Sequence, residues 1–317
     1  MSWHPSVSPE DARRVTCVGA GVIGGGWTAL FLARGFDVTV YDPTDEAETK
    51  VRRLIDLAWE PLSALGLAEG AARDRLSFAP TLEEAVADTH FVQESAPERL
   101  DLKRRVLADL DRATPPGVVI ASSTSGYGVS EMETEVEQTP ERMIVGHPFN
   151  PPYLIPLVEI AGGTRTAPEP LAWAEAFYRR AGKFVLPLER EVPGFVGNRL
   201  QEALWREALH MLAAGEASVE EIDAAIREGP GLRWALMGPC LTFHLAGGAG
   251  GMAYMLDHFG PSLEAPWTRL AAPELTEALR AALVTGCDAE ASGRTVEALV
   301  RERDQGLVTI LKARDRQ

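Results

Sequence analysis

The fold follows from one short stretch, which reads Val15-Thr16-Cys17-Val18-Gly19-Ala20-Gly21-Val22-Ile23-Gly24-Gly25-Gly26-Trp27. An apolar strand runs into a G-x-G-x-x-G turn and then into a helix. Gly19 permits the tight turn, Gly21 leaves room for a pyrophosphate, and Gly24 lets the helix pack against the strand. The helix N-terminus attracts anions through its unpaired N–H groups and its dipole. We therefore expect a dinucleotide to bind the loop of Gly19, Ala20, Gly21, Val22, Ile23 and Gly24.

An acidic residue follows where such a fold places its ribose-binding carboxylate. Residues 36–42 read as a second strand, and Asp42 ends it, 18 residues after Gly24. A carboxylate at this point accepts hydrogen bonds from the adenosine ribose and repels a 2′-phosphate. Asp42 therefore predicts NAD as the cofactor rather than NADP. The alternative is that Asp42 is only a solvated turn residue before Pro43.

Composition limits the classes of function. The chain has 317 residues, of which 45% are hydrophobic and 24% charged. This length suits two domains, and no apolar run reaches the roughly 18 residues of a membrane span. The net charge of −15 argues against nucleic-acid and membrane partners. Without a secretory signal at the N-terminus, we expect a cytoplasmic protein. The three cysteines show no metal-like spacing, so no metal site is expected.

Strand and helix patterns alternate through the first part of the chain. Further strands are predicted at 90–94, 118–122, 143–147, 157–160 and 183–186, and residues 44–74 predict two helices interrupted near Gly66. From Gly194 onward only helical periodicity remains. The sequence thus predicts an α/β fold: a Rossmann-type doubly wound sheet in an NAD-binding domain, 1–191, and a second all-helical domain, 192–317.

A general base is expected at the sheet edge where ligands bind. Of the six histidines, His147 alone ends a predicted strand of the sheet. Glu159 lies on the next predicted strand, where a hairpin would bring it beside His147. The carboxylate would then fix the imidazole tautomer and stabilise the imidazolium. The alternative is a structural histidine with a surface glutamate.

Two motifs resemble the signature of the L-3-hydroxyacyl-CoA dehydrogenase superfamily. They are Gly146-His147-Pro148-Phe149-Asn150-Pro151, with Leu157-Val158-Glu159-Ile160 behind it, and Pro193-Gly194-Phe195-Val196-Gly197-Asn198-Arg199. The resemblance runs from about Arg14 into the helical domain. It implies an NAD-dependent dehydrogenase that forms a homodimer through its helical domain.

The same resemblance implies roles for individual residues. His147 and Glu159 become the catalytic dyad, Ser125 the hydroxyl that bonds the reacting oxygen, and Asn198 a substrate contact. Glu98 and Lys103 match residues that line the nicotinamide side of the cofactor. Without the resemblance, these last two would be an ordinary solvated helix face.

Departures from the family pattern concern the substrate. Relatives that act on acyl-CoA read His-Phe-Phe-Asn and Asn-Thr-Ser-Ser, where this chain has His147-Pro148-Phe149-Asn150 and Ser123-Thr124-Ser125-Gly126. The segments 229–239 and 243–248 resemble the short-substrate branch that contains the L-gulonate and L-carnitine dehydrogenases, and in detail the carnitine group. This implies oxidation of L-carnitine at its 3-hydroxyl. The alternatives are L-gulonate, another short L-3-hydroxyacid or 3-hydroxyacyl-CoA, or a crystallin-like NAD-binding structural protein.

Carnitine would need an aromatic and a cationic contact. A quaternary ammonium is recognised by aromatic faces, and Trp234 and Phe243 lie in the segments that resemble the carnitine group. The alternative for both rings is core packing. The carboxylate of the substrate would need Arg199 or Arg233.

Overall fold

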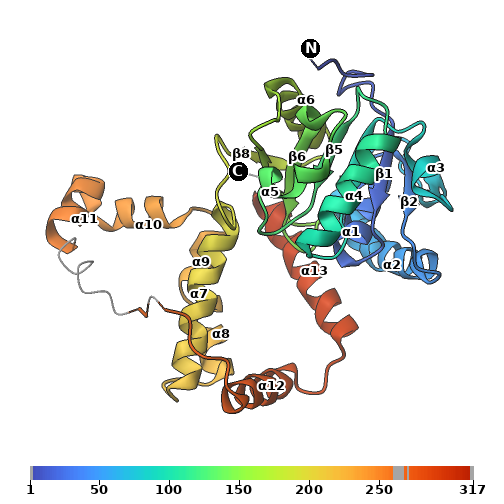
Figure 1. Ribbon diagram of the computed structural model, residues 1–317. Coiled ribbons are helices and arrows are strands. Elements are labelled where there is room, and N and C mark those ends of the chain that lie inside the picture. The colour runs from blue at the N-terminus through green and yellow to red at the C-terminus, as the bar shows by residue number, and fades with distance from the viewer. Residues whose placement is uncertain (1–2, 260–267, 270, 315–317) are drawn as a thin grey trace. The chain divides into compact units, whose positions relative to one another are not determined.

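The computed structural model describes residues 3–259, 268–269 and 271–314 (Figure 1). The chain divides into two compact units, Met1–Val196 and Gly197–Gln317. In the described part of the chain, no helix is long and apolar enough to span a membrane.

The first unit is built on one eight-stranded sheet of order β3-β2-β1-β4-β5-β6-β7-β8. Every neighbouring pair is parallel except β6 and β7, which are antiparallel. The strands are β1 (Arg14–Val18), β2 (Asp37–Tyr41), β3 (Leu76–Phe78), β4 (Phe91–Glu94), β5 (Val119–Ser122), β6 (Met143–Pro148), β7 (Leu157–Gly162) and β8 (Phe184–Pro187). The predicted doubly wound sheet is confirmed.

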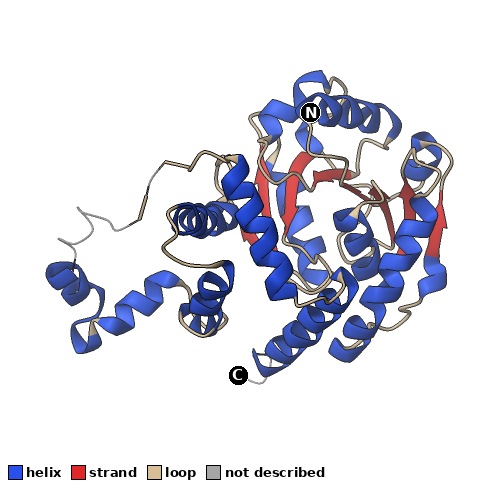
Figure 2. Ribbon diagram, turned by 90° about the horizontal axis from the view of Figure 1, so that it is seen from below, coloured by secondary structure: helices blue, strands red, loops and turns tan. Residues whose placement is uncertain are grey.

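Helices cover both faces of this sheet (Figure 2). One face packs against α1 (Val22–Ala33), α2 (Ala47–Leu65) and α6 (Pro168–Arg180). The other packs against α3 (Leu82–Val86), α4 (Leu100–Ala113) and α5 (Val129–Met132). Alternate residues of a strand point to opposite faces, so Val119 and Ala121 join the first core while Ile120 joins the second.

Aromatic rings fill the first of these cores. The Trp27 and Phe31 rings of α1 stack with centroids 5.4 Å apart, and the Phe91 and Phe177 centroids are 4.3 Å apart. Trp27, Phe31, Phe91 and Phe177 are fully buried. These contacts fix α1 and α6 against the central strands, and with α1 the glycine turn that precedes it.

The segment 44–74 differs from its prediction. It forms one long helix, α2, and a short 3-10 turn at Arg73–Arg75, so the prediction of two helices is wrong. Gly66 and Gly70 both adopt left-handed backbone angles, which end the helix and prevent a second one from starting. The chain then adds β3 to the edge of the sheet, a strand of three residues whose pattern is too short to recognise.

A buried ion pair joins the end of α4 to the start of β6. The Asp111 carboxylate accepts hydrogen bonds from the N–H groups of Gln138 (2.7 Å) and Thr139 (3.1 Å) and from Arg142 Nη2 (3.1 Å). Asp111 is 1% and Arg142 0% exposed. Arg142 also donates to main-chain carbonyls of Asp111 and Thr114. This cluster fixes the position at which β6 enters the sheet.

The second unit contains only helices in its described residues. They are α7 (Val196–Ala213, beginning one residue before the unit), α8 (Val219–Arg227), α9 (Pro230–Trp234), α10 (Pro239–Ala246), α11 (Gly251–Phe259), α12 (Glu277–Ala291) and α13 (Val296–Arg314). A capping box starts α8: Ser218 Oγ accepts from the Glu221 N–H, and the Glu221 carboxylate accepts from the Ser218 N–H. The prediction of an all-helical second part is confirmed.

Replacing Asp111 with Asn should destabilise the protein because it leaves Arg142 buried without its counter-charge. We expect Asp111→Asn to lower the free energy of unfolding by about 3–5 kcal/mol. The control Asp109→Asn, which breaks the exposed pair with Arg112 on the same helix, should change it by less than about 0.5 kcal/mol. Urea unfolding of the three proteins measures both differences.

The Asp111 effect should also depend on pH. Burial by itself raises the pKa of the Asp111 carboxyl, but the hydrogen bonds from Gln138, Thr139 and Arg142 together hold it below its ordinary value. The stabilisation is therefore complete above the unfolded-state pKa of about 3.9 and is lost as the pH falls through the lower folded-state value. The gap between wild type and Asp111→Asn should close in that acid range. A gap that stays constant down to pH 2 would contradict this account.

Candidate active site

The glycine turn between β1 and α1 has the shape of a phosphate cradle. Gly19 has a φ of 105°, and a Cβ on Gly24 would lie 1.9 Å from the Gly19 carbonyl oxygen. A Cβ on Gly21 would instead meet no atom within 4 Å, so open space lies over this part of the loop. Among the described residues no side chain caps α1, and the first turn of this helix carries no acidic residue. These features fit the diphosphate of a dinucleotide.

Asp42 lies beside this turn with its carboxylate held in place. Its Oδ2 accepts from the Ala20 N–H at 2.7 Å, and its Oδ1 accepts from the Thr44 N–H at 2.9 Å and the Thr44 hydroxyl at 2.6 Å. The residue lines a pocket of about 630 Å³, together with Gly19, Tyr41, Pro80, Ala96 and Pro97. The pocket lies at the carboxyl ends of the strands and is large enough for an adenosine.

His147 and Glu159 face each other across the antiparallel strands β6 and β7. The two residues are direct register partners. His147 Nδ1 lies 2.9 Å from Glu159 Oε2, and the side chains are 3% and 0% exposed. Glu159 Oε1 accepts from the Val196 N–H at 2.9 Å. The rings of Phe149 and Phe195 each lie 5.1 Å from the imidazole. The structure thus brings the two predicted residues together.

This geometry sets the roles of the two imidazole nitrogens. An ionised carboxylate only accepts hydrogen bonds, so Glu159 accepts one from Nδ1–H. Nε2 is then the nitrogen that can exchange a proton with a ligand. A buried carboxylate behind Nδ1 stabilises the imidazolium that forms when Nε2 takes up a proton. The pair can act as a general base with a fixed tautomer.

Glu98 and Lys103 hold the loop that follows β5. Lys103 is 1% exposed, and its Nζ lies 3.0 Å from Glu94 Oε1 and 3.4 Å from Glu98 Oε2. Glu98 Oε1 in turn accepts from the Thr124 hydroxyl at 2.6 Å and from the Ser125 N–H at 2.9 Å. Lys103 is therefore not part of a solvated helix face, because two carboxylates compensate the burial of its charge.

The remaining catalytic candidates lie in different parts of the chain. Ser125 is exposed on the loop between β5 and α5. Its neighbours Ser122 and Ser123 point inward instead: the Ser122 hydroxyl donates to Glu94, and the Ser123 hydroxyl bonds Gln93. Asn198 belongs to the first turn of α7, in the second unit.

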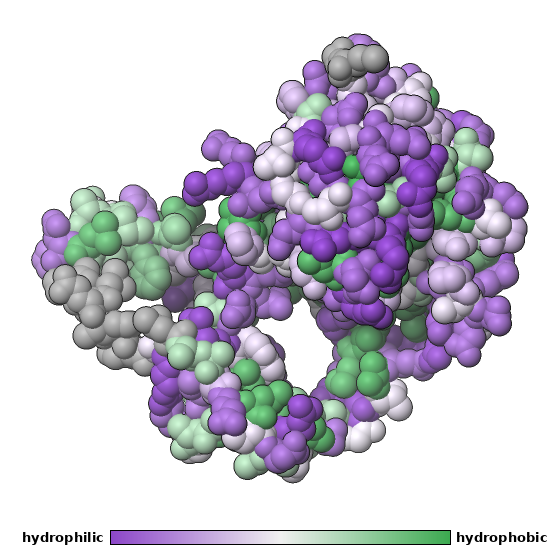
Figure 3. Space-filling view, in the orientation of Figure 1, coloured by the Kyte–Doolittle hydropathy of each residue, from purple (hydrophilic) through white to green (hydrophobic). Residues whose placement is uncertain are grey.

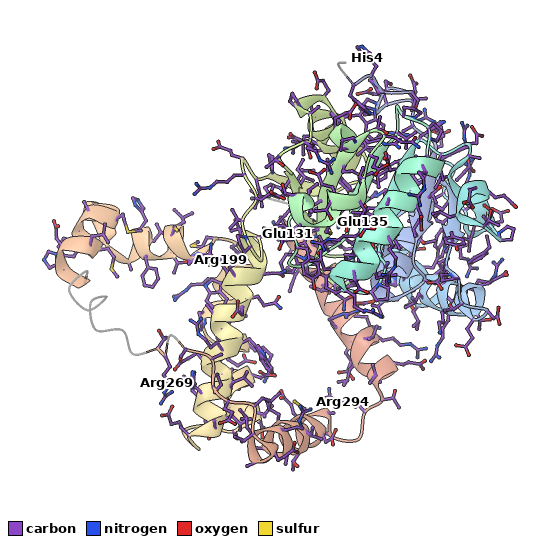
Figure 4. All side chains as sticks on the ribbon, in the orientation of Figure 1. His4, Glu131, Glu135, Arg199, Arg269 and Arg294 are labelled. Carbon is purple, nitrogen blue, oxygen red and sulfur yellow. The ribbon has the colours of Figure 1, made fainter. Side chains whose placement is uncertain are left out.

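The substrate-binding candidates all lie in the second unit. Arg199 is exposed near the start of α7 (Figure 4). Trp234 ends α9 and is 36% exposed, whereas Phe243 lies on α10 and is 51% exposed. Arg233 is exposed beside Trp234. Both rings are thus partly exposed to solvent in the described part of the chain.

Sequence reasoning missed Glu94 and Phe195. Glu94 ends β4 and is fully buried between Lys103 and the Ser122 hydroxyl. The criterion that selected His147, a polar residue at the carboxyl end of a strand, would have found it. Phe195 packs on the His147 ring from a left-handed backbone conformation with a φ of 53°. No local pattern indicates that contact.

Both parts of the chain match models of one protein family. The model for the NAD binding domain of 3-hydroxyacyl-CoA dehydrogenase matches residues 14–192, and the model for its C-terminal domain matches 194–288. The chain is 66% identical over 309 residues to an L-carnitine dehydrogenase from Streptomyces coelicolor, covering 98% of this chain and 97% of the relative. It is 51% identical over 307 residues to an L-carnitine dehydrogenase from Bacillus cereus, covering 97% and 94%.

Two solved structures have the same fold. One is 5-formyl-3-hydroxy-2-methylpyridine 4-carboxylic acid 5-dehydrogenase, an NAD⁺-dependent dismutase, with a TM-score of 0.80 and 27% identity over 95% of this chain and 98% of that one. The other is (S)-3-hydroxybutyryl-CoA dehydrogenase from Ralstonia eutropha, with a TM-score of 0.61 and 26% identity over 92% and 93%. The chain belongs to the 3-hydroxyacyl-CoA dehydrogenase family and is an NAD-dependent dehydrogenase.

Proposed function

We propose that this enzyme oxidises the 3-hydroxyl of L-carnitine to 3-dehydrocarnitine. The observation that carries the proposal is the 66% identity, over nearly the whole of both chains, to a protein named L-carnitine dehydrogenase. The second candidate substrate is L-gulonate. It is a polyhydroxylated anion, so its site would need several polar side chains instead of aromatic rings.

In this reaction His147 is the general base and Glu159 its partner. The hydroxyl proton passes to His147 Nε2 as the hydrogen on C3 leaves with its electron pair, and a carbonyl forms. NAD, when bound, supplies the acceptor for that hydride. Glu159 stays ionised, holds Nδ1–H and stabilises the imidazolium. The contact of 2.9 Å between buried groups supports these roles.

Other residues position the reactants. We assign Ser125 the hydrogen bond to the reacting oxygen and Asn198 a contact to the substrate. We assign Glu98 and Lys103 to the nicotinamide side: Glu98 accepts from the Ser125 N–H at 2.9 Å and pairs with Lys103 at 3.4 Å. Gly19–Gly24 and Asp42 bind the diphosphate and the adenosine ribose.

The helical domain, 192–317, binds the two charged ends of carnitine. Exposed rings suit a quaternary ammonium, which makes no conventional N–H hydrogen bonds, so we assign Trp234 and Phe243 to it. Arg199 or Arg233 binds the carboxylate. Both arginines are exposed and so available to an anion.

We also propose that the helical domain forms a homodimer. Residues on α7–α10 are all at least partly exposed, and large apolar side chains gather over α10 and α11 (Figure 3). A groove of about 550 Å³ between α7 and α8 is lined mainly by apolar side chains, among them Leu204, Trp205, Met211, Ile222 and Ile226. Apolar surface of this extent is typical of a protein interface. A second copy of the chain would cover it.

Asp42 should determine the choice between NAD and NADP. In wild type, kcat/KM should be much higher with NAD, because the carboxylate accepts from the ribose and repels a 2′-phosphate. Asp42→Ala should lower kcat/KM with NAD about 10-fold or more and so reduce the difference in kcat/KM between NAD and NADP. Thr44→Val removes only the hydroxyl that bonds Asp42 Oδ1 and should have a smaller effect. Equal efficiency of the wild type with both cofactors would refute the assignment.

Removing the base should affect turnover and not cofactor binding. His147→Gln should lower kcat about 100-fold or more, the scale of general-base catalysis, with an unchanged Kd for NADH. The control is His90→Gln, which replaces an imidazole whose Nδ1 accepts from the Arg13 N–H at 2.9 Å. Near-normal turnover of His147→Gln would show that the mechanism is wrong.

The substrate is tested with L-carnitine, L-gulonate and 3-hydroxybutyrate, which lacks the cation. Steady-state kinetics should give the highest kcat/KM for L-carnitine. Trp234→Ala should raise KM for carnitine about 5- to 30-fold and change that for 3-hydroxybutyrate less. Leu232→Ala, an exposed neighbour on the same helix, is the matched control. A higher kcat/KM for L-gulonate than for L-carnitine would contradict the proposal and assign the enzyme to L-gulonate oxidation.

A further inference from the structure

A chain of buried polar groups lies beneath the glycine turn. The Tyr178 hydroxyl donates to Gln93 Oε1 at 2.6 Å, and Gln93 Nε2 donates to Ser123 Oγ at 2.8 Å. Trp27 Nε1 also donates to Ser123 Oγ, at 3.2 Å, and Ser95 Oγ lies 2.9 Å from it. Tyr178 and Gln93 are fully buried, and Ser123 is 9% exposed.

The direction of each hydrogen bond in this chain can be deduced. Gln93 Nε2 lies 3.4 Å from the Gly146 carbonyl oxygen, so the amide nitrogen and not its oxygen faces that side. The indole N–H of Trp27 can only donate. Ser123 Oγ therefore accepts two hydrogen bonds, which uses both of its lone pairs. Its own proton must go to Ser95 Oγ.

The Ser95 hydroxyl therefore accepts a hydrogen bond from Ser123, and its own proton points away from Ser123. Across residues 3–259, 268–269 and 271–314, the structure gives the Ser95 hydroxyl no partner other than Ser123. Ser95 is half-buried and follows β4 directly. A Cβ on Gly24 would lie 3.4 Å from the Ser95 Cβ, so the residue borders the cradle.

The order of the strands indicates which part of the dinucleotide Ser95 faces. The strands lie side by side in the order β2-β1-β4-β5-β6. At their carboxyl ends this order places Asp42 first, then Gly19, Ser95 and Ser123, and His147 last. The adenosine pocket beside Asp42 is lined by Ala96 and Pro97 but not by Ser95. Ser95 thus lies between the phosphate turn and the general base.

We propose that Ser95 is a cofactor-binding residue whose hydroxyl donates a hydrogen bond to the nicotinamide half of NAD, oriented by Ser123. The bond is directed because Ser95 must accept from Ser123 and has only one proton to give. The inference rests on NAD as the cofactor and is independent of the carnitine proposal.

Binding of NADH and of ADP, followed by fluorescence and calorimetry, tests this role. Ser95→Ala should raise the Kd for NADH about 3- to 10-fold, the scale of one hydrogen bond, and leave the Kd for ADP unchanged. The proposal would be overturned if the Kd for NADH were unchanged, or if the Kd values for NADH and ADP rose by the same factor. The matched control Ser77→Ala removes a hydroxyl on the edge strand β3, which bonds Thr39 of β2, and should change neither Kd.

Two more variants separate a direct contact from a structural effect. Ser123→Ala disturbs the same network, so it should lower the melting temperature while changing the Kd for NADH less than Ser95→Ala does. Ser95→Cys keeps a side chain of similar shape with a weak donor and should weaken NADH binding as Ala does. An equal loss from Ser123→Ala, or full binding by Ser95→Cys, would contradict donation by Ser95.

Discussion

The contact between His147 and Glu159 depends on a single change of strand direction. All other neighbouring strands of the sheet are parallel, and a parallel partner for β6 would have to return through a long crossover. The antiparallel β7 instead places Glu159 directly opposite His147, twelve residues along the chain. A register slip of one residue would turn one of the two side chains to the opposite face of the sheet.

Charges buried around this edge are matched with partners. Lys103 lies between Glu94 and Glu98, and Arg142 lies against Asp111. Isolated charges in such places would cost several kcal/mol each. Each cluster joins the end of one element to the start of another. Lys103 pairs with Glu98, which accepts from the Ser125 N–H, and Arg142 fixes the entry of β6. The positions of the Ser125 loop and of β6 therefore depend on these buried charge pairs.

Local patterns in the sequence were enough to predict much of this arrangement. The glycine turn, Asp42 and the strand ending at His147 all follow from residue types at fixed spacing, and Glu159 follows from the expected hairpin. The burial of Lys103 did not, because helical periodicity places it on a charged face, and its partners Glu94 and Glu98 lie on other elements. The edge strand β3 is too short to show alternation. The direction of the Ser95 hydroxyl depends on Trp27, Gln93 and Gly146, which come from separate elements.

The account depends most on the proton held between His147 Nδ1 and Glu159. Long-range ¹H–¹⁵N NMR of protein labelled in its histidines reports which imidazole nitrogen carries the proton in the neutral ring. Glu159 accepts from Nδ1, so the shifts assigned to the neutral ring of His147 should show a protonated Nδ1 and an unprotonated Nε2. Glu159→Gln should change this tautomer balance. A neutral His147 protonated on Nε2 in the wild type would contradict the account, because that nitrogen could not then accept the substrate proton.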